Sequence, residues 1–478
     1  MATRSQNPAN LIFIPFPIIS HQAAAVQTAG LLVDRNPRLT ATIIVMKLPV
    51  DTKTTTPDHN PRIRFVKLPP DEQSFAKCST NPNSFTVHYP ESHKGRVRDT
   101  VMKIINESSP HSGRVAGFVV DMFCTAMIDV ANELGLPSYI FYTGNASNLG
   151  LSFGLQEFID RENKDLANYE NTDFELSIPI YASSVPAKVW PTIVFEKESN
   201  WSNFTRKFRG AEGIVVNTFL ELEPRAIRAL SEDKATPPVY PVGPIIESGG
   251  RGRGVISREE EVVMRWLDGQ PDSSVVFLCF GSAGWFGAEQ VKEIAEGLEN
   301  SRQRFLWSLR KPAPEGKFEF PGEYDDPREV LPEGFLEQTV GFGKVIGWAP
   351  QMAVLAHRAV GGFVSHCGWN SVLESVWFGV PLAAWPIYAE QQANAFQLVR
   401  ELGIAVEIKV EYNMKSCNGI VPAGRIEGAV RELMGQENEG RRAKVRALSG
   451  TSRAVMSEGG SSYDYLGRFI DSVLENIS

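Results

Sequence analysis

Residues 348–391 read WAPQMAVLAHRAVGGFVSHCGWNSVLESVWFGVPLAAWPIYAEQ. The apolar run at 359–365 predicts a buried strand, the polar stretch at 365–370 predicts a turn, and 371–378 predicts a helix that ends at Gly379. A second apolar run follows at 381–386. A strand, a turn, a helix and a further strand in this order are typical of a parallel α/β sheet.

The same alternation of apolar runs and helical patterns extends through both halves of the chain. It predicts an α/β protein with two doubly wound parallel sheets. Strands are expected at 11–16, 41–46, 62–68, 115–121 and 138–143, and then at 274–280, 304–309, 343–348, 359–365 and 381–386. Ligands of open parallel sheets bind beyond the carboxyl ends of the strands, so the chemistry is expected there.

The length of 478 residues predicts more than one domain. A segment rich in proline, glycine and charge predicts a linker at 244–260, between an N-terminal domain at 1–243 and a C-terminal domain at 261–460. Residues 461–478 have the pattern of an amphipathic helix, and 311–330 are expected to form an exposed, mobile loop.

Composition and charge exclude several classes of function. A formal net charge of -8 argues against a nucleic-acid partner or an anionic membrane surface, both of which require a basic face. The apolar run near the N-terminus is short and contains two prolines, and no segment reaches the length of a membrane span. A cytoplasmic protein without membrane insertion is therefore expected.

The cysteines and histidines point to neither disulfides nor a metal. The five cysteines are widely separated and form no C-x-x-C pair, so reduced thiols are expected. The seven histidines form no H-E-x-x-H motif, and no Asp-x-Asp occurs. No dedicated metal site is expected.

The turn at 365–370 has the features of a phosphate site. The start of a helix carries free N–H groups and a partial positive charge, and His366, Asn370 and Ser371 add side-chain donors there. The alternative is a capped helix, with Asn370 or Ser371 as the N-cap and Glu374 completing a capping box with Ser371. The neighbouring residues favour the phosphate interpretation.

Those neighbours supply the other groups that a nucleotide requires. In the Trp-Ala-Pro-Gln turn, Trp348 and Ala349 come after a strand, where an indole face suits a flat base and the amide of Gln351 suits its edge. Glu374, one turn into the helix, suits ribose hydroxyls. Taken alone, a tryptophan such as Trp348 is more often a core residue than a stacking surface.

Two further segments complete this half of the site. Glu390 and Gln391 follow a strand, and an acid beside an amide can bind vicinal hydroxyls, although the pair also suits an ordinary helix start. The glycines of FGSAGWFG at 280–287 do not have the spacing of a dinucleotide fingerprint, so they are poor evidence for NAD. Ser282 could approach a diphosphate, or the segment could be a flexible turn before a helix capped near Gly287.

The first domain offers a candidate base. His21 follows the first strand, and a histidine near its neutral pKa can take a proton from a hydroxyl group. Asp121 ends the apolar strand VAGFVVD, and an aspartate can orient an imidazole and stabilise its charged form. Each residue alone could be structural, but their matched positions at strand ends favour a catalytic pair.

Residues 348–391 resemble the signature box of plant family-1 UDP-sugar glycosyltransferases over the full length of that box. His21, FVVDMFC, VVNTFLELEP, PVGP and FLCFGS are similar to further segments of this family. The resemblance implies a GT-B fold, in which two Rossmann-like domains face each other across a cleft. It implies an N-terminal acceptor domain, a C-terminal donor domain and a last helix that returns to the first domain.

The resemblance also implies roles for individual residues. Trp348 would stack on uracil, Gln351 would bind its edge and Glu374 would bind the ribose hydroxyls. The diphosphate would be held by Ser282, His366, Asn370 and Ser371. The sugar would be contacted by Trp369, Glu390, Gln391 and Thr143. In this family a final Gln accompanies UDP-glucose and a His often marks UDP-galactose, so Gln391 favours glucose.

These observations predict an inverting glucosyltransferase of plant secondary metabolism that acts on a hydroxyl of a small lipophilic metabolite of phenolic, flavonoid or terpenoid type. UDP-glucose would be its donor substrate, with no cofactor, and the enzyme would be a monomer. The alternatives are a non-catalytic binder of sugar nucleotides or metabolites, and a transferase that uses another UDP-sugar. A nicotinamide dehydrogenase would need a glycine fingerprint after strand one, which PFPIISH lacks.

Two departures from the family pattern concern the site. Ile18 and Ser20 stand where the family commonly has glycine, close to His21. Their bulk is expected to reshape the acceptor pocket or to move His21. Ala283 and Trp285 differ from the smaller polar residues usual after the strand that ends at 280, and Trp285 could narrow the cleft.

Overall fold

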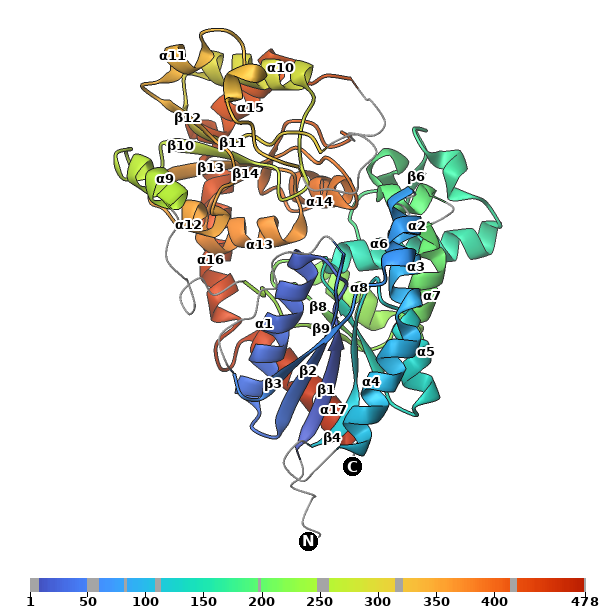
Figure 1. Cartoon of the computed structure of the whole chain (residues 1–478). Coiled ribbons are helices and arrows are strands. Elements are labelled where there is room, and N and C mark those ends of the chain that lie inside the picture. Colours follow the sequence, from blue (N-terminus) through green and yellow to red (C-terminus); the bar gives the residue numbers. More distant parts are fainter. Residues whose placement is uncertain are drawn as a thin grey trace.

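The computed structural model describes residues 8–49, 60–80, 84–107, 113–196, 199–246, 258–313, 321–412 and 419–476. These residues form two α/β domains, with the N-terminal domain in the lower half of Figure 1 and the C-terminal domain above it. Most of the predicted linker, at 247–257, lies outside the described residues, as does 314–320 of the predicted loop.

The N-terminal domain contains a seven-stranded parallel sheet in the order β3-β2-β1-β4-β5-β8-β9. The strands are β1 (Ala9–Ile14), β2 (Leu39–Met46), β3 (Ile63–Leu68), β4 (Arg114–Asp121), β5 (Ser138–Tyr142), β8 (Gly213–Val216) and β9 (Val239–Pro241). The helices are α1 (Ile19–Arg35), α2 (Glu72–Thr80), α3 (Phe85–Ser92), α4 (Lys94–Asn106), α5 (Ala126–Glu133), α6 (Ala146–Glu162), α7 (Trp201–Phe208) and α8 (Pro224–Glu232). Between α6 and α7 lie the short strands β6 (Glu175–Leu176) and β7 (Val185–Pro186) and the turns η2 (Leu166–Tyr169), η3 (Ala187–Val189) and η4 (Thr192–Phe195).

The C-terminal domain contains a six-stranded parallel sheet in the order β12-β11-β10-β13-β14-β15. The strands are β10 (Val275–Cys279), β11 (Arg304–Ser308), β12 (Gly343–Ile346), β13 (Val360–Ser365), β14 (Leu382–Ala384) and β15 (Ala405–Glu407). The helices are α9 (Arg258–Asp268), α10 (Ala288–Ser301), α11 (Phe335–Thr339), α12 (Gln351–Leu355), α13 (Trp369–Phe378), α14 (Gln391–Phe396), α15 (Ala423–Met434) and α16 (Glu439–Ala454), and the chain then continues into a last helix, α17 (Ser461–Glu475). A π-helical turn, η7 (Gln397–Glu401), continues α14, and the short turns η6 (Pro327–Glu329) and η8 (Gln436–Asn438) complete the domain.

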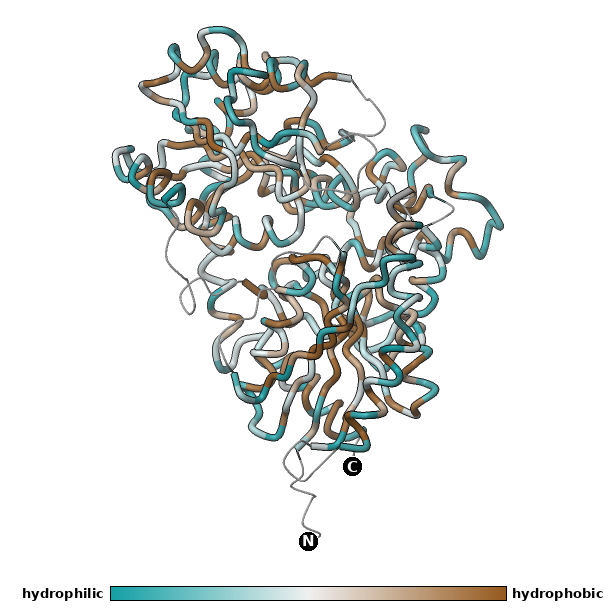
Figure 2. The backbone as a smooth tube through the Cα atoms, in the orientation of Figure 1, coloured by the Kyte–Doolittle hydropathy of each residue, from teal (hydrophilic) through white to brown (hydrophobic). Residues whose placement is uncertain are grey.

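The α/β fold with two doubly wound parallel sheets is thus confirmed, and every strand expected from the sequence overlaps an observed strand. Figure 2 shows the apolar residues concentrated in the strands of the N-terminal sheet, with hydrophilic residues on the helices around them. Within the described ranges, no helix combines the length and the apolar character needed to cross a bilayer.

Each sheet has a point where the chain reverses its direction of strand addition. In the N-terminal sheet this point lies between β1 and β4, and in the C-terminal sheet it lies between β10 and β13. Loops on the two sides of such a point diverge, which leaves a crevice at the carboxyl ends of the strands where ligands bind. The fold therefore predicts one binding region at the end of each of these strand pairs.

The last helix, α17, packs on the N-terminal sheet, and α16 runs toward it from the C-terminal domain (Figure 1). The apolar face of α17 joins the core that contains residues of β1 and β2; its members are Leu466, Phe469, Ile470 and Val473. The ring of Phe469 lies edge-on to that of Tyr139 on β5, with centroids 5.0 Å apart. We therefore group α17 with the N-terminal domain.

Phe469→Ala tests the energy of this packing. The side chain is fully buried, so its loss should lower the free energy of unfolding by about 3–5 kcal/mol. Urea denaturation of the variant and of the matched Arg468→Ala, whose side chain is exposed on the same helix, would measure it. Equal stabilities of the two variants would contradict a close-packed α17.

Candidate functional site

His21 and Asp121 meet at the reversal point of the N-terminal sheet. His21 lies in the first turn of α1, after β1, and Asp121 is the last residue of β4, which pairs with β1. The Nδ1 atom of His21 is 2.7 Å from Oδ2 of Asp121, and the Asp121 side chain is fully buried. The other carboxylate oxygen, Oδ1, accepts a hydrogen bond from the backbone N–H of Phe123 at 3.0 Å.

The electrostatics of this pair suit a proton acceptor. Burial alone would lower the pKa of His21, but the charge and hydrogen bond of Asp121 and the charge of Glu390 outweigh it and raise that pKa above its ordinary value. With Nδ1–H donated to Asp121, the neutral ring presents Nε2 as the atom that can accept a proton. Glu390 belongs to the C-terminal domain, so the charges that raise the pKa of His21 come from both domains.

Aromatic rings surround His21. The ring centroids of Phe16 and Phe123 lie 5.7 and 5.6 Å from that of His21. Phe85 of α3 lies edge-on to Phe16, and Phe204 of α7 lies edge-on to Phe123. The surroundings of His21 are therefore apolar and aromatic.

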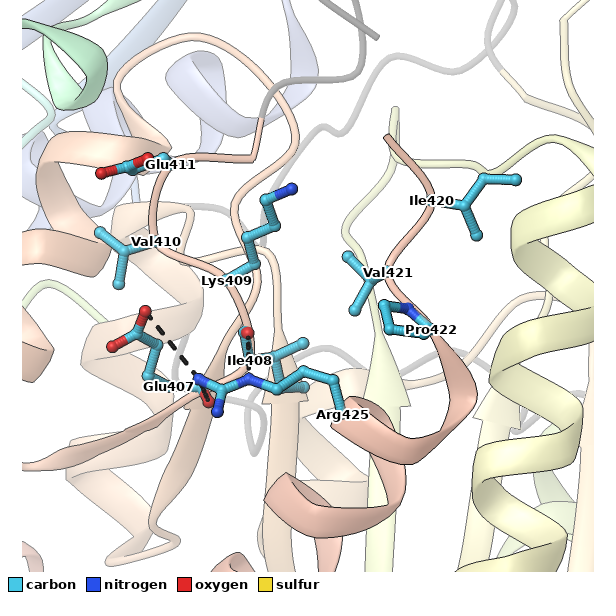
Figure 3. A pocket seen from close by; sticks show the side chains of 9 residues that line it. All are labelled: Glu407, Ile408, Lys409, Val410, Glu411, Ile420, Val421, Pro422 and Arg425. Atoms are coloured by element: carbon cyan, nitrogen blue, oxygen red, sulfur yellow. Dashed lines mark hydrogen bonds and ion pairs between the residues drawn. The ribbon is translucent and has the colours of Figure 1, made fainter. Parts of the chain in front are cut away.

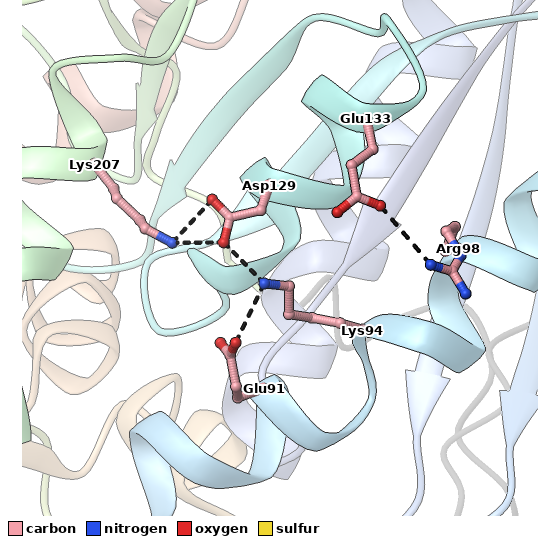
Figure 4. A network of polar contacts seen from close by, with 6 residues as sticks. All are labelled: Glu91, Lys94, Arg98, Asp129, Glu133 and Lys207. Atoms are coloured by element: carbon pink, nitrogen blue, oxygen red, sulfur yellow. Dashed lines mark hydrogen bonds and ion pairs between the residues drawn. The ribbon is translucent and has the colours of Figure 1, made fainter.

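An ion-pair network joins four helices beside these rings, two of which, α3 and α7, carry Phe85 and Phe204 (Figure 4). Asp129 of α5 accepts hydrogen bonds from Lys94 of α4 at 2.9 Å and from Lys207 of α7 at 3.1 and 3.0 Å. Burial alone would raise the pKa of Asp129, but its bonds to the two ammonium groups lower it. Lys94 also donates to Glu91 of α3 at 3.2 Å, so the network reaches all four helices.

The predicted phosphate turn lies at the reversal point of the C-terminal sheet. β13 ends at Ser365, and α13 begins at Trp369 with Gly368 as its N-cap and no side-chain cap. The capping interpretation of Asn370 and Ser371 is therefore wrong, because the helix starts before both residues. The first N–H groups of any helix have no partner within it, which favours an anion at this position.

His366 is held between two glycines in this turn. A Cβ atom on Gly281, after β10, would lie 2.6 Å from Nε2 of His366, and one on Gly368 would lie 2.5 Å from it. His366 is 6% exposed, and burial lowers the pKa of its imidazole to about 4, so the ring is neutral near pH 7. Among the described residues its buried Nδ1 has no hydrogen-bond partner, although nearly all buried polar groups have one.

The residues predicted to bind a nucleobase and a ribose lie beside this turn. Nε2 of Gln351 donates to Oγ of Ser371 at 2.8 Å and to Oε2 of Glu374 at 2.7 Å. The Trp348 side chain is 58% exposed, which is unusual for so large an apolar ring. The Arg310 guanidinium lies 5.2 Å from the centre of that ring. An exposed indole beside a hydrogen-bonded amide and carboxylate can receive a flat heterocycle and a diol.

The other predicted donor residues differ in how accessible they are. Trp369 is buried, and its indole N–H donates to the backbone oxygen of Asn217 in the N-terminal domain at 2.6 Å. Gln391 is buried, and its Oε1 accepts from the backbone N–H groups of Ile387 and Tyr388 at 2.9 and 3.0 Å. Glu390 is the N-cap of α14, and burial raises its pKa.

Three further predicted residues lie in the loops around the site. Thr143 follows β5 and donates from Oγ1 to the sulfur of Met122 at 3.6 Å. Ser282 is exposed in the loop after β10, and Ala349 is buried just before α12. The structure therefore brings the predicted residues to the carboxyl ends of the two sheets.

The loop before His21 lacks the usual glycines, but it does not move His21 away from Asp121. Ile18 is the N-cap of α1 with φ -122° and ψ 150°, an extended backbone that needs no glycine. The side chain of Ile19 is exposed and Ser20 is also exposed. His21 still reaches Asp121, so the bulk of Ile18 does not separate the pair.

Phe16 and Phe123 were not among the predicted site residues. The sequence indicates them only by their position just beyond strand ends: Phe16 follows β1, and Phe123 is two residues after Asp121. Aromatic residues near strand ends are as often part of the core, so the sequence alone could not separate the two cases.

A separate pocket lies between the end of β15 and the start of α15 (Figure 3). Its lining consists of Glu407, Ile408, Lys409, Val410, Glu411, Ile420, Val421, Pro422 and Arg425. Arg425 donates to the backbone oxygens of Ile408 and Glu407 at 2.9 and 3.0 Å, and no predicted site residue lines the pocket. Across the described part of the chain, no group of three or more His, Cys, Asp or Glu is placed to hold a metal ion.

Comparison with known proteins identifies the family. The model of the UDP-glucoronosyl and UDP-glucosyl transferase family matches residues 260–429. A UDP-glucose flavonoid 3-O-glucosyltransferase of Fragaria ananassa is 50% identical, over 97% of this chain and 98% of its own length.

Solved structures agree with this relationship. A UGT transferase of Siraitia grosvenorii in complex with UDP superposes with a TM-score of 0.86 at 43% identity, over 98% of this chain and 100% of its own. A UGT of Medicago truncatula complexed with UDP-glucose gives a TM-score of 0.86 at 38% identity, over 98% of each chain. The GT-B fold and the resemblance of residues 348–391 are confirmed, and the chain belongs to the plant family-1 UDP-glycosyltransferases.

Proposed function

We propose that this glycosyltransferase moves glucose from UDP-glucose to a hydroxyl of a small lipophilic plant metabolite, of phenolic, flavonoid or terpenoid type, with inversion at the anomeric carbon. The observation that carries the proposal is the His21–Asp121 pair, at 2.7 Å, whose imidazole also lies within the electrostatic reach of Glu390 in the other domain. The proposed general base, His21, thus comes from the N-terminal sheet, and the proposed donor site comes from the C-terminal sheet.

The reaction follows from this placement. Nε2 of His21 takes the proton of the acceptor hydroxyl while its oxygen attacks the anomeric carbon of glucose. The new C–O bond forms on one face of the sugar as the bond to the diphosphate oxygen breaks on the other face. The bonding electrons leave with UDP, and Asp121 stabilises the imidazolium that results. The products are the glucoside and UDP, and His21 releases its proton to solvent.

The donor would be held by the groups described above. Trp348 would stack on the uracil, Gln351 would bind its edge with Ala349 beside it, and Glu374 would accept from the ribose hydroxyls. The diphosphate would occupy the start of α13, with contacts from Ser282, His366, Asn370 and Ser371. Glycines at 281 and 368, where a Cβ atom would lie 2.6 and 2.5 Å from Nε2 of His366, support this assignment.

The sugar would lie between the two domains, with Trp369, Glu390, Gln391 and Thr143 around it. Gln391 favours glucose by its resemblance to family members that use UDP-glucose. The Fragaria relative named for UDP-glucose and the Medicago structure with UDP-glucose support the same donor. The aromatic wall formed by Phe16 and Phe123 supports a planar, apolar acceptor.

A non-catalytic sugar-nucleotide binder is the alternative class, and the hydrogen-bonded His21–Asp121 pair argues against it because a binder has no need of a base. One chain supplies both halves of the site, which supports a monomer as the active unit. The described cysteines are buried free thiols, which suits the cytoplasm.

Removal of the base should abolish most turnover. His21→Ala should lower kcat by about 10²- to 10⁴-fold with an alcohol acceptor and leave the Kd for UDP unchanged. His357→Ala is the matched control, because His357 forms a similar ion pair with Asp268 outside the site, at 3.2 Å. Initial rates of UDP release in the presence of acceptor would measure the difference. Undiminished turnover in His21→Ala would refute the role of His21 as the general base.

Asp121→Asn tests the electrostatic part of the proposal. The base works only when deprotonated, so activity falls at low pH below the pKa of His21, which Asp121 raises. Without this carboxylate, burial becomes the dominant effect on the pKa of His21 and lowers it. The acid limb of the kcat/KM profile should therefore move to lower pH, and kcat should fall by up to about 10⁴-fold. Asp268→Asn, in the His357 pair, is the control. An acid limb that stays in place or moves to higher pH would contradict the role of Asp121.

Trp348→Ala tests whether the uracil stacks on the indole of Trp348. Stacking of a nucleobase on an aromatic ring is worth about 1–3 kcal/mol, so the Kd for UDP should rise by about 5- to 150-fold. Isothermal titration calorimetry would measure it, with Trp266→Ala on α9 as a control that should bind like the wild type. Wild-type affinity in Trp348→Ala would show that uracil binds elsewhere.

A further inference from the structure

A buried network of side-chain amides joins the two domains next to the proposed sugar position. Asn145 follows β5 and the Thr143–Gly144 pair, and it begins α6. Its Nδ2 donates to Oδ1 of Asn394 and to Oε1 of Gln397, both at 2.8 Å and both in the C-terminal domain. Its own Oδ1 caps α6 by accepting from the backbone N–H of Asn148 at 2.6 Å.

Asn394 connects this contact to the phosphate turn. Its Nδ2 donates to the backbone oxygen of Cys367 at 2.9 Å, and Cys367 lies between β13 and α13. Asn394 lies one helical turn after Glu390, whose backbone oxygen accepts from the Asn394 N–H at 3.1 Å. One buried amide therefore touches the loop after β5, the turn after β13 and the helix that carries Glu390 and Gln391.

The direction of these hydrogen bonds is fixed. If the Asn394 amide were rotated by half a turn, its oxygen would face the oxygen of Cys367. Nε2 of Gln397 donates to Oγ of Ser147 and to Oε1 of Glu223, each at 2.8 Å, so a rotated Gln397 would turn its oxygen toward a buried carboxylate. Oδ1 of Asn394 and Oε1 of Gln397 therefore both require a hydrogen-bond donor at position 145.

We propose that Asn145 and Asn394 form an interdomain amide bridge that sets the position of the donor sugar relative to His21. The two are positioning residues: they act through the loop of Thr143, through the turn of His366 and through Glu390. Both lie outside residues 348–391, and the inference rests on the proposed function. Misplacement of reacting groups by about 1 Å can cost roughly 10²-fold in rate, so a bridge at this position can control transfer.

Asn145→Asp separates the bridge from the helix cap. Aspartate is an equally good N-cap, so α6 keeps its start. The new carboxylate can donate to neither Asn394 nor Gln397, and its oxygens oppose theirs. We expect kcat/KM for UDP-glucose to fall by at least about tenfold while the Kd for UDP stays within about twofold. The fraction of UDP released by hydrolysis without acceptor should rise, because the site would no longer exclude water as well.

Asn438→Asp is the matched control. Asn438 is also fully buried, but its Nδ2 donates to the backbone oxygen of Leu433 within the C-terminal domain, at 2.8 Å. The same change of amide to acid at this position should leave the kinetics and the hydrolysed fraction at wild-type values. Thermal unfolding of both variants shows whether each is folded.

Asn145→Ser provides a second variant, which keeps a capping hydroxyl and adds no charge. If the bridge is one functional unit, Asn145→Ser combined with Asn394→Ser should lower kcat/KM no further than the more severe single change. Additive losses would contradict a shared role.

The outcomes distinguish this inference from the proposed function. Wild-type kcat/KM and hydrolysed fraction in folded Asn145→Asp and Asn145→Ser would overturn the bridge, as would equal weakening of UDP and UDP-glucose binding. Loss of folded protein in all three single variants would make the residues structural supports and would also overturn it. A wild-type enzyme that transfers no glucose from UDP-glucose would refute the proposed function itself.

Discussion

The carboxyl ends of two parallel sheets meet between the domains, and every part of the proposed site depends on this constraint. His21 and Asp121 come from the reversal point of the first sheet, and Gly281 and His366 come from the reversal point of the second. Neither sheet alone offers both the proposed base and the proposed anion site. In the proposed function, one half of the molecule binds the donor and the other half binds the acceptor.

Directional polar contacts join the two domains near the site, beside an apolar core that has members from both domains. The indole of Trp369 donates to the backbone of Asn217, and Asn145 donates to Asn394 and Gln397. Hydrogen bonds are directional, and a buried polar group left without its partner costs about 1–3 kcal/mol. Such contacts therefore favour one relative position of the domains over its neighbours.

The sequence predicted the fold and the donor residues because their signals are local. Strand runs such as 41–46 are long and apolar, and the donor residues lie within one segment. Strands β8, β9 and β15 were missed: they have only three or four residues, and apolar runs this short are ambiguous by pattern, although β12 and β14 of the same lengths were predicted. The start of α13 was placed too late, since Gly368 gives no capping signal. The hydrogen bond of His21 to Asp121 and the bridge from Asn145 to Asn394 join residues 100 and 249 positions apart, which no local pattern can show.

The crystal structure of the His21→Ala variant with UDP-glucose would test the central claim most directly, because the intact donor would remain bound. The account predicts the uracil on Trp348, the diphosphate at the start of α13 beside His366, and the glucose between Glu390 and position 21. A nucleotide bound elsewhere, for example in the pocket beside Arg425, or a sugar that points away from position 21, would contradict it.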